Sequence, residues 1–286
     1  MENLLKQKLD NSKNPYLTSY SRRYSEWKRR QTIAKAFKNF VAGHNGTHIN
    51  VLEVGCGEGT SSFQLQNFFK DNHNIVFTGT DISTEAVQFA NLRVSNEQID
   101  NCKFVVADAN KLPFQQDQFD IVISSEVIEH MEDPAVTIAE SFRVLKAGGE
   151  AIFTTPNGGV TPLRRAAHVL DALTFHLFSA GRRKVDLSDT NMVTGPAVSG
   201  LMEENLGFGH ISVYSYHRWK TIFIKAGFEV IDSVGTGGLL LGMPSLDMHR
   251  IFFASTLVAD AIIDHLPLSH LCSENLQFEL RKPYAR

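Results

Sequence analysis

The chain has 286 residues, of which 43% are hydrophobic, and a formal net charge of -3. This length and composition allow one catalytic domain with appended elements. The nearly balanced charge provides no general basic surface for phosphate backbones, so nucleic acid is not the expected substrate. The three cysteines cannot all pair, and Cys56 lies within a glycine-rich turn, so a reducing cytoplasm is the expected compartment. The sequence shows no secretory signal and predicts no stable insertion into a membrane.

The first 48 residues predict a helical cap on the core. Apolar side chains recur near one helical face in this segment, namely Trp27, Ile33, Ala36, Phe37 and Phe40. From residue 49 to 157 the pattern changes to short apolar runs that alternate with helical stretches, which is typical of β-α-β units and a parallel sheet. The expected strands cover 50–54, 74–80, 103–107, 120–124 and 150–155, and the expected helices begin at 61, 83 and 134.

The second half of the chain interrupts this alternation. Residues 158–210 mix basic, apolar and Gly/Ser/Thr-rich stretches, and we interpret them as an insertion that folds over a ligand. Residues 211–286 are expected to complete the fold, with a helix at 217–226 and strands at 228–234 and 276–280. A substrate-side insertion with another helix is expected at 239–275.

The strongest motif is a glycine-rich turn that follows the first predicted strand. It runs from Glu53 through Gly55, Cys56 and Gly57 to Gly59, just before a predicted helix. Glycines allow a tight turn and the close approach of a ligand, and the helix N-terminus presents unpaired N–H groups. The GxGxG spacing differs from the GxGxxG of dinucleotide-binding enzymes. Glu53 could accept a hydrogen bond from a cationic amine of a ligand, or it could brace the turn.

Two acidic residues follow at the ends of the next two predicted strands. Asp81 lies close to the offset at which a carboxylate commonly meets both ribose hydroxyls, or it belongs with Ser83 to the N-cap region of the next helix. Asp108 could accept the adenine amino hydrogens while the backbone at Ala109 meets a ring nitrogen, or it could simply cap its strand. Ile82 could flank the base.

The fourth motif lies at the end of the strand predicted at 120–124. Because doubly wound folds bind ligands at the carboxyl ends of parallel strands, Ser125 and Glu126 are expected to border the cofactor. Glu129 and His130 follow at once and are placed to reach a substrate.

In this order, the four motifs resemble class I S-adenosylmethionine-dependent methyltransferases. The closest similarity is to the small-molecule group that includes the ubiquinone-biosynthesis O-methyltransferases, over 51–157 and again over 217–228. The resemblance implies a doubly wound, Rossmann-like α/β fold. Its seven-stranded sheet would be mostly parallel with an antiparallel last strand, an N-terminal helical cap and helical insertions over the active site.

The resemblance also implies which residues bind S-adenosylmethionine. The glycines would line its methionine portion, Asp81 its ribose and Asp108 its adenine, and an Arg of the N-terminal helix would meet its carboxylate. The implied contacts are Arg30 (or Arg29), Glu53, Gly55, Cys56, Gly57, Gly59, Asp81, Ile82, Asp108, Ala109, Ser125 and Glu126.

The sulfonium methyl group is already activated, so the protein mainly aligns the reacting atoms and excludes water. A hydroxyl nucleophile also needs a proton acceptor, and an imidazole with a pKa of about 6.5 suits this role. His130 is the first candidate, followed by His210 and His217, with Glu129 as a carboxylate alternative; each could instead be a structural residue. His210 and His217 have no nearby cysteine partners, so no metal site is expected.

The leading hypothesis is methyl transfer to a hydroxyl oxygen of a small metabolite in a biosynthetic pathway, with a quinone-like, polyketide, sugar or peptide product. An N-methyltransferase is the nearest alternative, and it would need less of a base. From a different class, the chain could be a non-catalytic, cofactor-binding partner subunit. A nicotinamide oxidoreductase is disfavoured by the GxGxG spacing. The sequence leaves the acceptor and the oligomeric state open.

Overall fold

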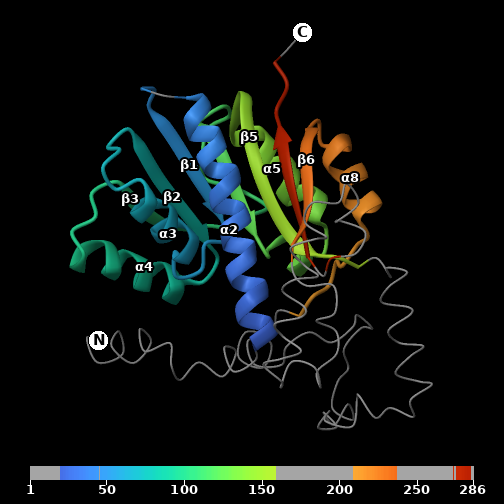
Figure 1. Ribbon diagram of the computed structural model, residues 1–286, viewed down its shortest axis with the longest axis horizontal. Helices are drawn as coiled ribbons and strands as arrows, with labels where there is room; N and C mark the ends of the chain where they lie inside the picture. The colour runs from blue at the N-terminus through green and yellow to red at the C-terminus, as the bar shows by residue number, and fades with distance from the viewer. Residues whose placement is uncertain (1–19, 45, 159–208, 237–272, 274, 285–286) are drawn as a thin grey trace. The chain divides into compact units, whose positions relative to one another are not determined.

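The computed structural model describes residues 20–44, 46–158, 209–236, 273 and 275–284 (Figure 1). The chain divides into two compact units. One unit contains most of the sheet and comprises Arg30–Thr155, His217–Ser233 and Gln277–Arg286. The other comprises Met1–Arg29, Pro156–Tyr216 and Val234–Leu276. Within the described ranges, no helix is long and apolar enough to cross a membrane.

Seven strands form one sheet in the order β3-β2-β1-β4-β5-β7-β6. Strands β1 to β5 pair in parallel, and β7 runs in the opposite direction between β5 and β6 (Figure 1). The predicted doubly wound, mostly parallel fold with an antiparallel last strand is therefore confirmed. The strands are β1 (Ile49–Val54), β2 (Ile75–Asp81), β3 (Cys102–Val106), β4 (Phe119–Ser125), β5 (Leu145–Pro156), β6 (Glu229–Thr236) and β7 (Asn275–Arg281).

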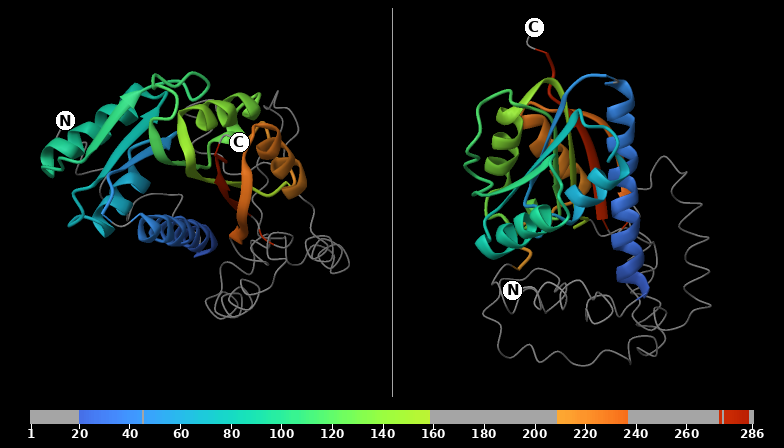
Figure 2. Two further views of the ribbon diagram at one scale, coloured as in Figure 1. Left: turned by 90° about the horizontal axis from the view of Figure 1, so that it is seen from above. Right: turned by 90° about the vertical axis from the view of Figure 1, so that its left-hand side faces the viewer.

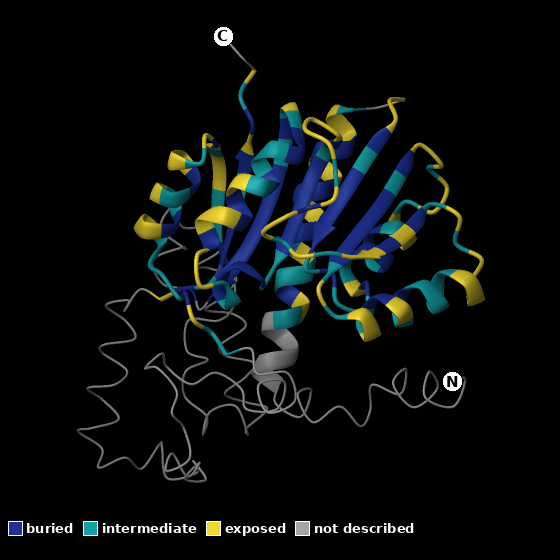
Figure 3. Cartoon of the chain, turned by 180° about the vertical axis from the view of Figure 1, so that it is seen from behind, coloured by how far each residue is buried: buried dark blue, intermediate teal, exposed yellow. Residues whose placement is uncertain are grey.

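Helices cover both faces of the sheet (Figure 2). Helices α2, α3 and α4 share one hydrophobic cluster with the strands, whereas α5 and α8 lie on the opposite face. The sheet strands are mostly buried and the outer helix faces are exposed (Figure 3). The helices are α2 (Tyr20–Gly43), α3 (Thr60–Phe68), α4 (Thr84–Asn96), α5 (Pro134–Val144) and α8 (Tyr216–Lys225), with a short 3-10 helix η3 (Ile128–His130).

Local sequence explains where two of these helices begin. The side chain of Ser83 accepts a hydrogen bond from the N–H of Ala86 and starts α4. The side chain of Asp133 accepts one from the N–H of Ala135 and starts α5, with Pro134 in the first turn. Both helix starts agree with the predicted positions.

One predicted core residue is wrong. Ile33 and Phe37 of α2 are buried as expected, but Trp27 is 56% exposed. A helix turns once every 3.6 residues or so, so Trp27 points about 180° away from the buried Ala36, nine positions later. The domain division stays a prediction, because most of 158–210 and 239–275 lies outside the described residues.

The buried Lys282 joins the end of β7 to the segments that lead into β4 and β5. This edge of the sheet is opposite the one that carries the motifs predicted to bind the cofactor. The Nζ of Lys282 donates to an oxygen of Asp117 at 2.7 Å and to the carbonyls of Phe142 and Leu145 at 2.9 and 2.7 Å. The hydrogen bond from Lys282 also holds the pKa of the Asp117 carboxyl below its ordinary value. Because Lys282 is only 8% exposed, the protein replaces most of the solvation that its charge requires.

We expect Lys282→Met to lower the free energy of unfolding by about 3 kcal/mol, since two buried carbonyls and a carboxylate lose a charged donor. Urea denaturation measures this loss. Arg281→Met is the matched control: it removes an ion pair between the exposed Arg281 and the half-buried Glu150, and its cost should stay below about 1 kcal/mol. Equal losses in the two variants would contradict the role of Lys282.

Candidate functional site

The turn after β1 is built on backbone conformations that side chains resist. Gly55 and Gly57 have φ angles of 70° and 51°, in the left-handed region. A Cβ on Gly55 would lie 2.3 Å from Cγ2 of Val127, so the turn packs directly against the segment that follows β4. A Cβ on Gly57 would meet no protein atom within 4 Å, so the turn leaves open space beside its backbone for a ligand.

Hydrogen bonds join this turn to the end of β2. Asp81 accepts a bond from the N–H of Gly57 at 2.7 Å through one oxygen and from the N–H of Ser83 at 2.9 Å through the other. The N–H of Cys56 donates to the carbonyl of Thr80 at 2.8 Å, and the Cys56 side chain is buried. The structure thus brings the first two predicted motifs together through one backbone bond and one bond to the Asp81 carboxylate.

Glu53 lies beneath the turn and is only 4% exposed. Its Oε2 accepts hydrogen bonds from the backbone N–H of Ser62, at 3.0 Å, and from the Ser62 hydroxyl. Burial raises the pKa of the Glu53 carboxyl from its ordinary 4.5 to about 7, against hydrogen bonds from Ser62 and Ser61 that lower it. The side chain therefore braces the start of α3, which was one of its two predicted roles; Ser62 itself was not predicted.

The ends of β2 and β3 pair side by side in the sheet. The N–H of Ala107 donates to the carbonyl of Asp81 at 2.9 Å. Beside this contact Ile82 is 60% exposed, Asp108 is exposed and Ala109 is half-buried. The two segments predicted to meet a nucleoside therefore reach the same edge of the sheet. Arg30 is half-buried on α2.

The end of β4 adopts a strained turn. Glu126 has a φ of 58°, which costs a residue with a side chain on the order of 1 kcal/mol. Its N–H donates to the carbonyl of Thr154 at 3.0 Å, and the hydroxyls of Ser125 and Thr154 lie 2.9 Å apart. The sequence did not predict Thr154 of β5. Its contact with Ser125 depends on the register between β4 and β5, which no local motif encodes.

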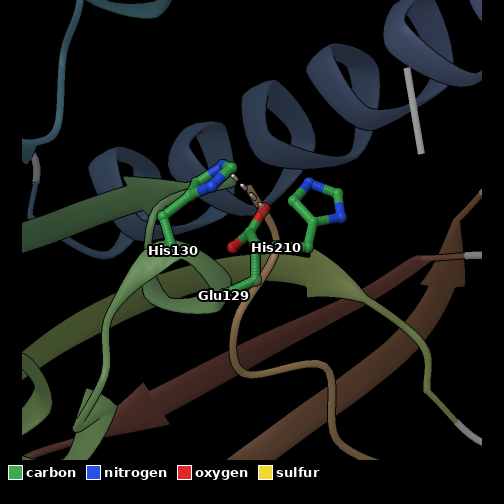
Figure 4. Close-up of side chains that lie close together, drawn as sticks. All are labelled: Glu129, His130 and His210. Atoms are coloured by element: carbon green, nitrogen blue, oxygen red, sulfur yellow. Dashed lines mark ion pairs between the residues drawn. The ribbon is translucent and has the colours of Figure 1, made fainter. Parts of the chain in front are cut away.

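This turn leads into η3, which presents Glu129 and His130 (Figure 4). Glu129 is fully buried, whereas 28% of the His130 side chain is exposed, and its Nε2 lies 3.9 Å from Oε1 of Glu129. The pair combines a carboxylate with a partly accessible imidazole. Figure 4 also labels His210, which is half-buried in the other compact unit; His217 is exposed near the start of α8.

The raised pKa of Glu53 predicts how stability changes with pH. The folded carboxyl titrates at about 7 and the unfolded one near 4.5, so the folded state holds the extra proton between these values. The resulting stabilisation is fully present below pH 4.5 and is lost as the pH rises through 7. Glu53→Gln should lack this loss, so its stability relative to the native protein should rise by up to about 3 kcal/mol across this range. Urea denaturation across the range measures the difference, and two parallel pH profiles would refute it.

Residues 45–227 match a family described as the methyltransferase domain. Relatives include an uncharacterized methyltransferase of Schizosaccharomyces pombe, 31% identical over 46% of this chain and 47% of its own length. The 27-O-demethylrifamycin SV methyltransferase of Amycolatopsis mediterranei is 28% identical over 51% and 58%. The ubiquinone biosynthesis O-methyltransferase of Coxiella burnetii is 32% identical over 38% and 44%. The chain thus spans about half the length of the curated relatives it matches.

Solved structures share the fold. Phosphoethanolamine N-methyltransferase 2 of Haemonchus contortus, in complex with S-adenosylmethionine, matches with a TM-score of 0.55 and 18% identity, over 90% of this chain and 53% of its own. A Haloferax volcanii methyltransferase in complex with the activator Trm112 matches with a TM-score of 0.52 and 18% identity, over 94% and 100%. The family match covers more than half of the chain, and the chain therefore belongs to the methyltransferase-domain family.

Proposed function

We propose that the protein transfers the methyl group of S-adenosylmethionine to a hydroxyl oxygen of a small cytoplasmic metabolite, in a biosynthetic pathway and without a metal ion. The observation that carries this proposal is the placement of Glu129 and His130 directly beyond the carboxyl end of β4 (Figure 4). Ligands of doubly wound sheets bind at this edge, where the strand order reverses between β1 and β4.

The cofactor would lie along the glycine turn and across the ends of β2 and β3. Its methionine portion would lie beside Gly57, where no protein atom occupies the space next to the backbone. A carboxylate has about four acceptor sites, so Asp81 could accept two ribose hydroxyls besides its bonds to Gly57 and Ser83. The adenine would reach Asp108 and Ala109. Further contacts would come from Ser125 and Glu126 through their backbone and from Arg30.

When bound, the cofactor supplies an electrophilic methyl group. The protein then has to hold the acceptor hydroxyl in line and take up its proton. His130 is the proposed acceptor of that proton, because its imidazole is accessible and adjoins the ligand-binding edge. The carboxylate of Glu129, 3.9 Å away, would stabilise the imidazolium that forms.

Methyl transfer to an amine is the second candidate. Glu126 and Glu129 both follow β4, and their carboxylates would attract a protonated amine. The bound amine loses its proton to solvent before it attacks, and a neutral amine is a good nucleophile, whereas a hydroxyl must give up its proton as it attacks. This reaction therefore depends less on a base in the site. The two reactions therefore differ in their response to loss of the histidines.

The first experiment tests the cofactor site. Gly57→Ala should leave the protein folded, because its Cβ meets no protein atom and the left-handed φ costs an alanine only about 1 kcal/mol. It should still raise the Kd for S-adenosylmethionine about tenfold or more by filling ligand space. Isothermal titration calorimetry measures the affinity. Gly46→Ala is the matched control: Gly46 also has a positive φ, 80°, and open surroundings, but it lies in a turn before β1. Unchanged binding by Gly57→Ala would remove the turn from the cofactor site.

The second experiment tests the base. An acceptor screen that detects S-adenosylhomocysteine would cover phenols, catechols, sugar hydroxyls and amines. With a hydroxyl acceptor, His130→Ala should lower turnover about 100-fold or more, because the proton has no acceptor, while cofactor affinity is kept. The exposed His73, before β2, supplies the control variant His73→Ala. Near-normal turnover by His130→Ala would end the base assignment, and full activity after loss of His210 and His217 as well would favour an amine acceptor.

A further inference from the structure

Helix α5 holds the loop that connects β3 to β4, which we define as residues 107–118. The hydroxyl of Thr137 donates to Oδ1 of Asn110 at 2.7 Å, and the Thr137 residue is fully buried. One turn further along α5, Oε2 of Glu140 accepts the backbone N–H of Leu112 at 3.0 Å. Two side chains on one face of the helix thus fix two successive parts of the loop.

Arg143 completes this attachment. Its guanidinium donates to the carbonyls of Phe114 and Leu112 at 2.9 and 3.2 Å. It also makes two bonds of 2.8 Å to Glu140, which lower the pKa of the Glu140 carboxyl and raise the pKa of Arg143. Residues spaced three apart on a helix lie on one face, so Thr137, Glu140 and Arg143 act on the loop together.

The attachment extends to the residue proposed to meet adenine. The N–H of Asn110 donates to Oδ1 of Asp108 at 2.8 Å, and the N–H of Lys111 donates to the carbonyl of Asp108 at 3.0 Å. A continuous series of bonds therefore runs from Thr137 through Asn110 to the Asp108 carboxylate. Asp108 is itself exposed, so no surrounding core holds it in place.

We propose that Thr137, Glu140 and Arg143 are positioning residues for the adenosine end of the cofactor. They hold the 107–118 loop in the conformation in which Asp108 and Ala109 face the base, so the loop does not have to be ordered when the cofactor binds. This inference rests on the proposed adenine contacts of those two residues. It gives helix α5, on the face of the sheet opposite α2, α3 and α4, a role in cofactor affinity.

The test uses two probes that share the adenosine group, S-adenosylhomocysteine and 5′-methylthioadenosine, titrated into the full chain by calorimetry. Arg143→Met should raise the Kd of both probes about tenfold, and Thr137→Val, which keeps the shape of the side chain, about threefold. Arg143→Lys should fall between Arg143→Met and the native protein, because an ammonium can reach one of the two carbonyls. Stoichiometry, read from the same titrations, should stay at one site per folded chain.

The controls separate positioning from stability. A merely structural role would lower the melting temperature or the folded fraction and leave the Kd of the folded protein unchanged. Arg281→Met removes another Arg–Glu pair without touching the loop and should leave both Kd values unchanged. A weaker Kd for S-adenosylhomocysteine alone would place the effect at the methionine end and overturn the inference.

Asp108→Ala distinguishes the positioning role from the adenine contact on which it rests. If it weakens both probes while Arg143→Met and Thr137→Val bind within about twofold of the native protein, the positioning role is overturned and the adenine contact stands. If Asp108→Ala binds both probes normally, the proposed adenine contact fails, and the positioning role fails with it.

Discussion

The site depends on the absence of a side chain at Gly55. The Val127 side chain fills the space that a Cβ on Gly55 would occupy. The backbone of the turn after β1 therefore packs directly against a side chain of the segment after β4. The same turn bonds to the end of β2 through Gly57 and Asp81. One short turn therefore fixes the ends of three neighbouring strands. The segment that carries His130 follows Val127, which packs against that turn.

The acidic residues around this turn divide into two kinds. Glu53 is buried and has its hydrogen bonds satisfied by Ser62, so its contribution is to the shape of the turn. Asp81 is half-buried and uses only part of its bonding capacity within the protein. Their charges repel, which contributes to the raised pKa of Glu53. A cationic ligand beside the turn would relieve this repulsion, which suits a sulfonium compound with an ammonium group.

The sequence predicted the sheet and the glycine turn because both are encoded locally, by short apolar runs and by residues next to one another. It predicted Trp27 wrongly, because the nine positions between Trp27 and Ala36 are about two and a half helical turns and place the two side chains on opposite faces. It gave no signal for Lys282, whose partner Asp117 lies 165 residues away, or for the bond from Thr137 to Asn110, since such pairs are created by the packed fold. The predicted insertion at 158–210 is not tested, because almost all of it lies outside the described residues.

The contrast between locally encoded turns and contacts made by the packed fold also explains why the sequence points to a cofactor but not to an acceptor. The elements that would hold the cofactor are strand ends and turns of the shared sheet, and the curated relatives match the chain over about half of their length. Acceptor groups differ among enzymes with one cofactor, so the residues that select them need not belong to the shared part. Glu129 and His130 lie just after the last residue of β4, where the strand of the shared sheet ends. Their proposed role in acceptor chemistry therefore falls at the point where the shared strands end.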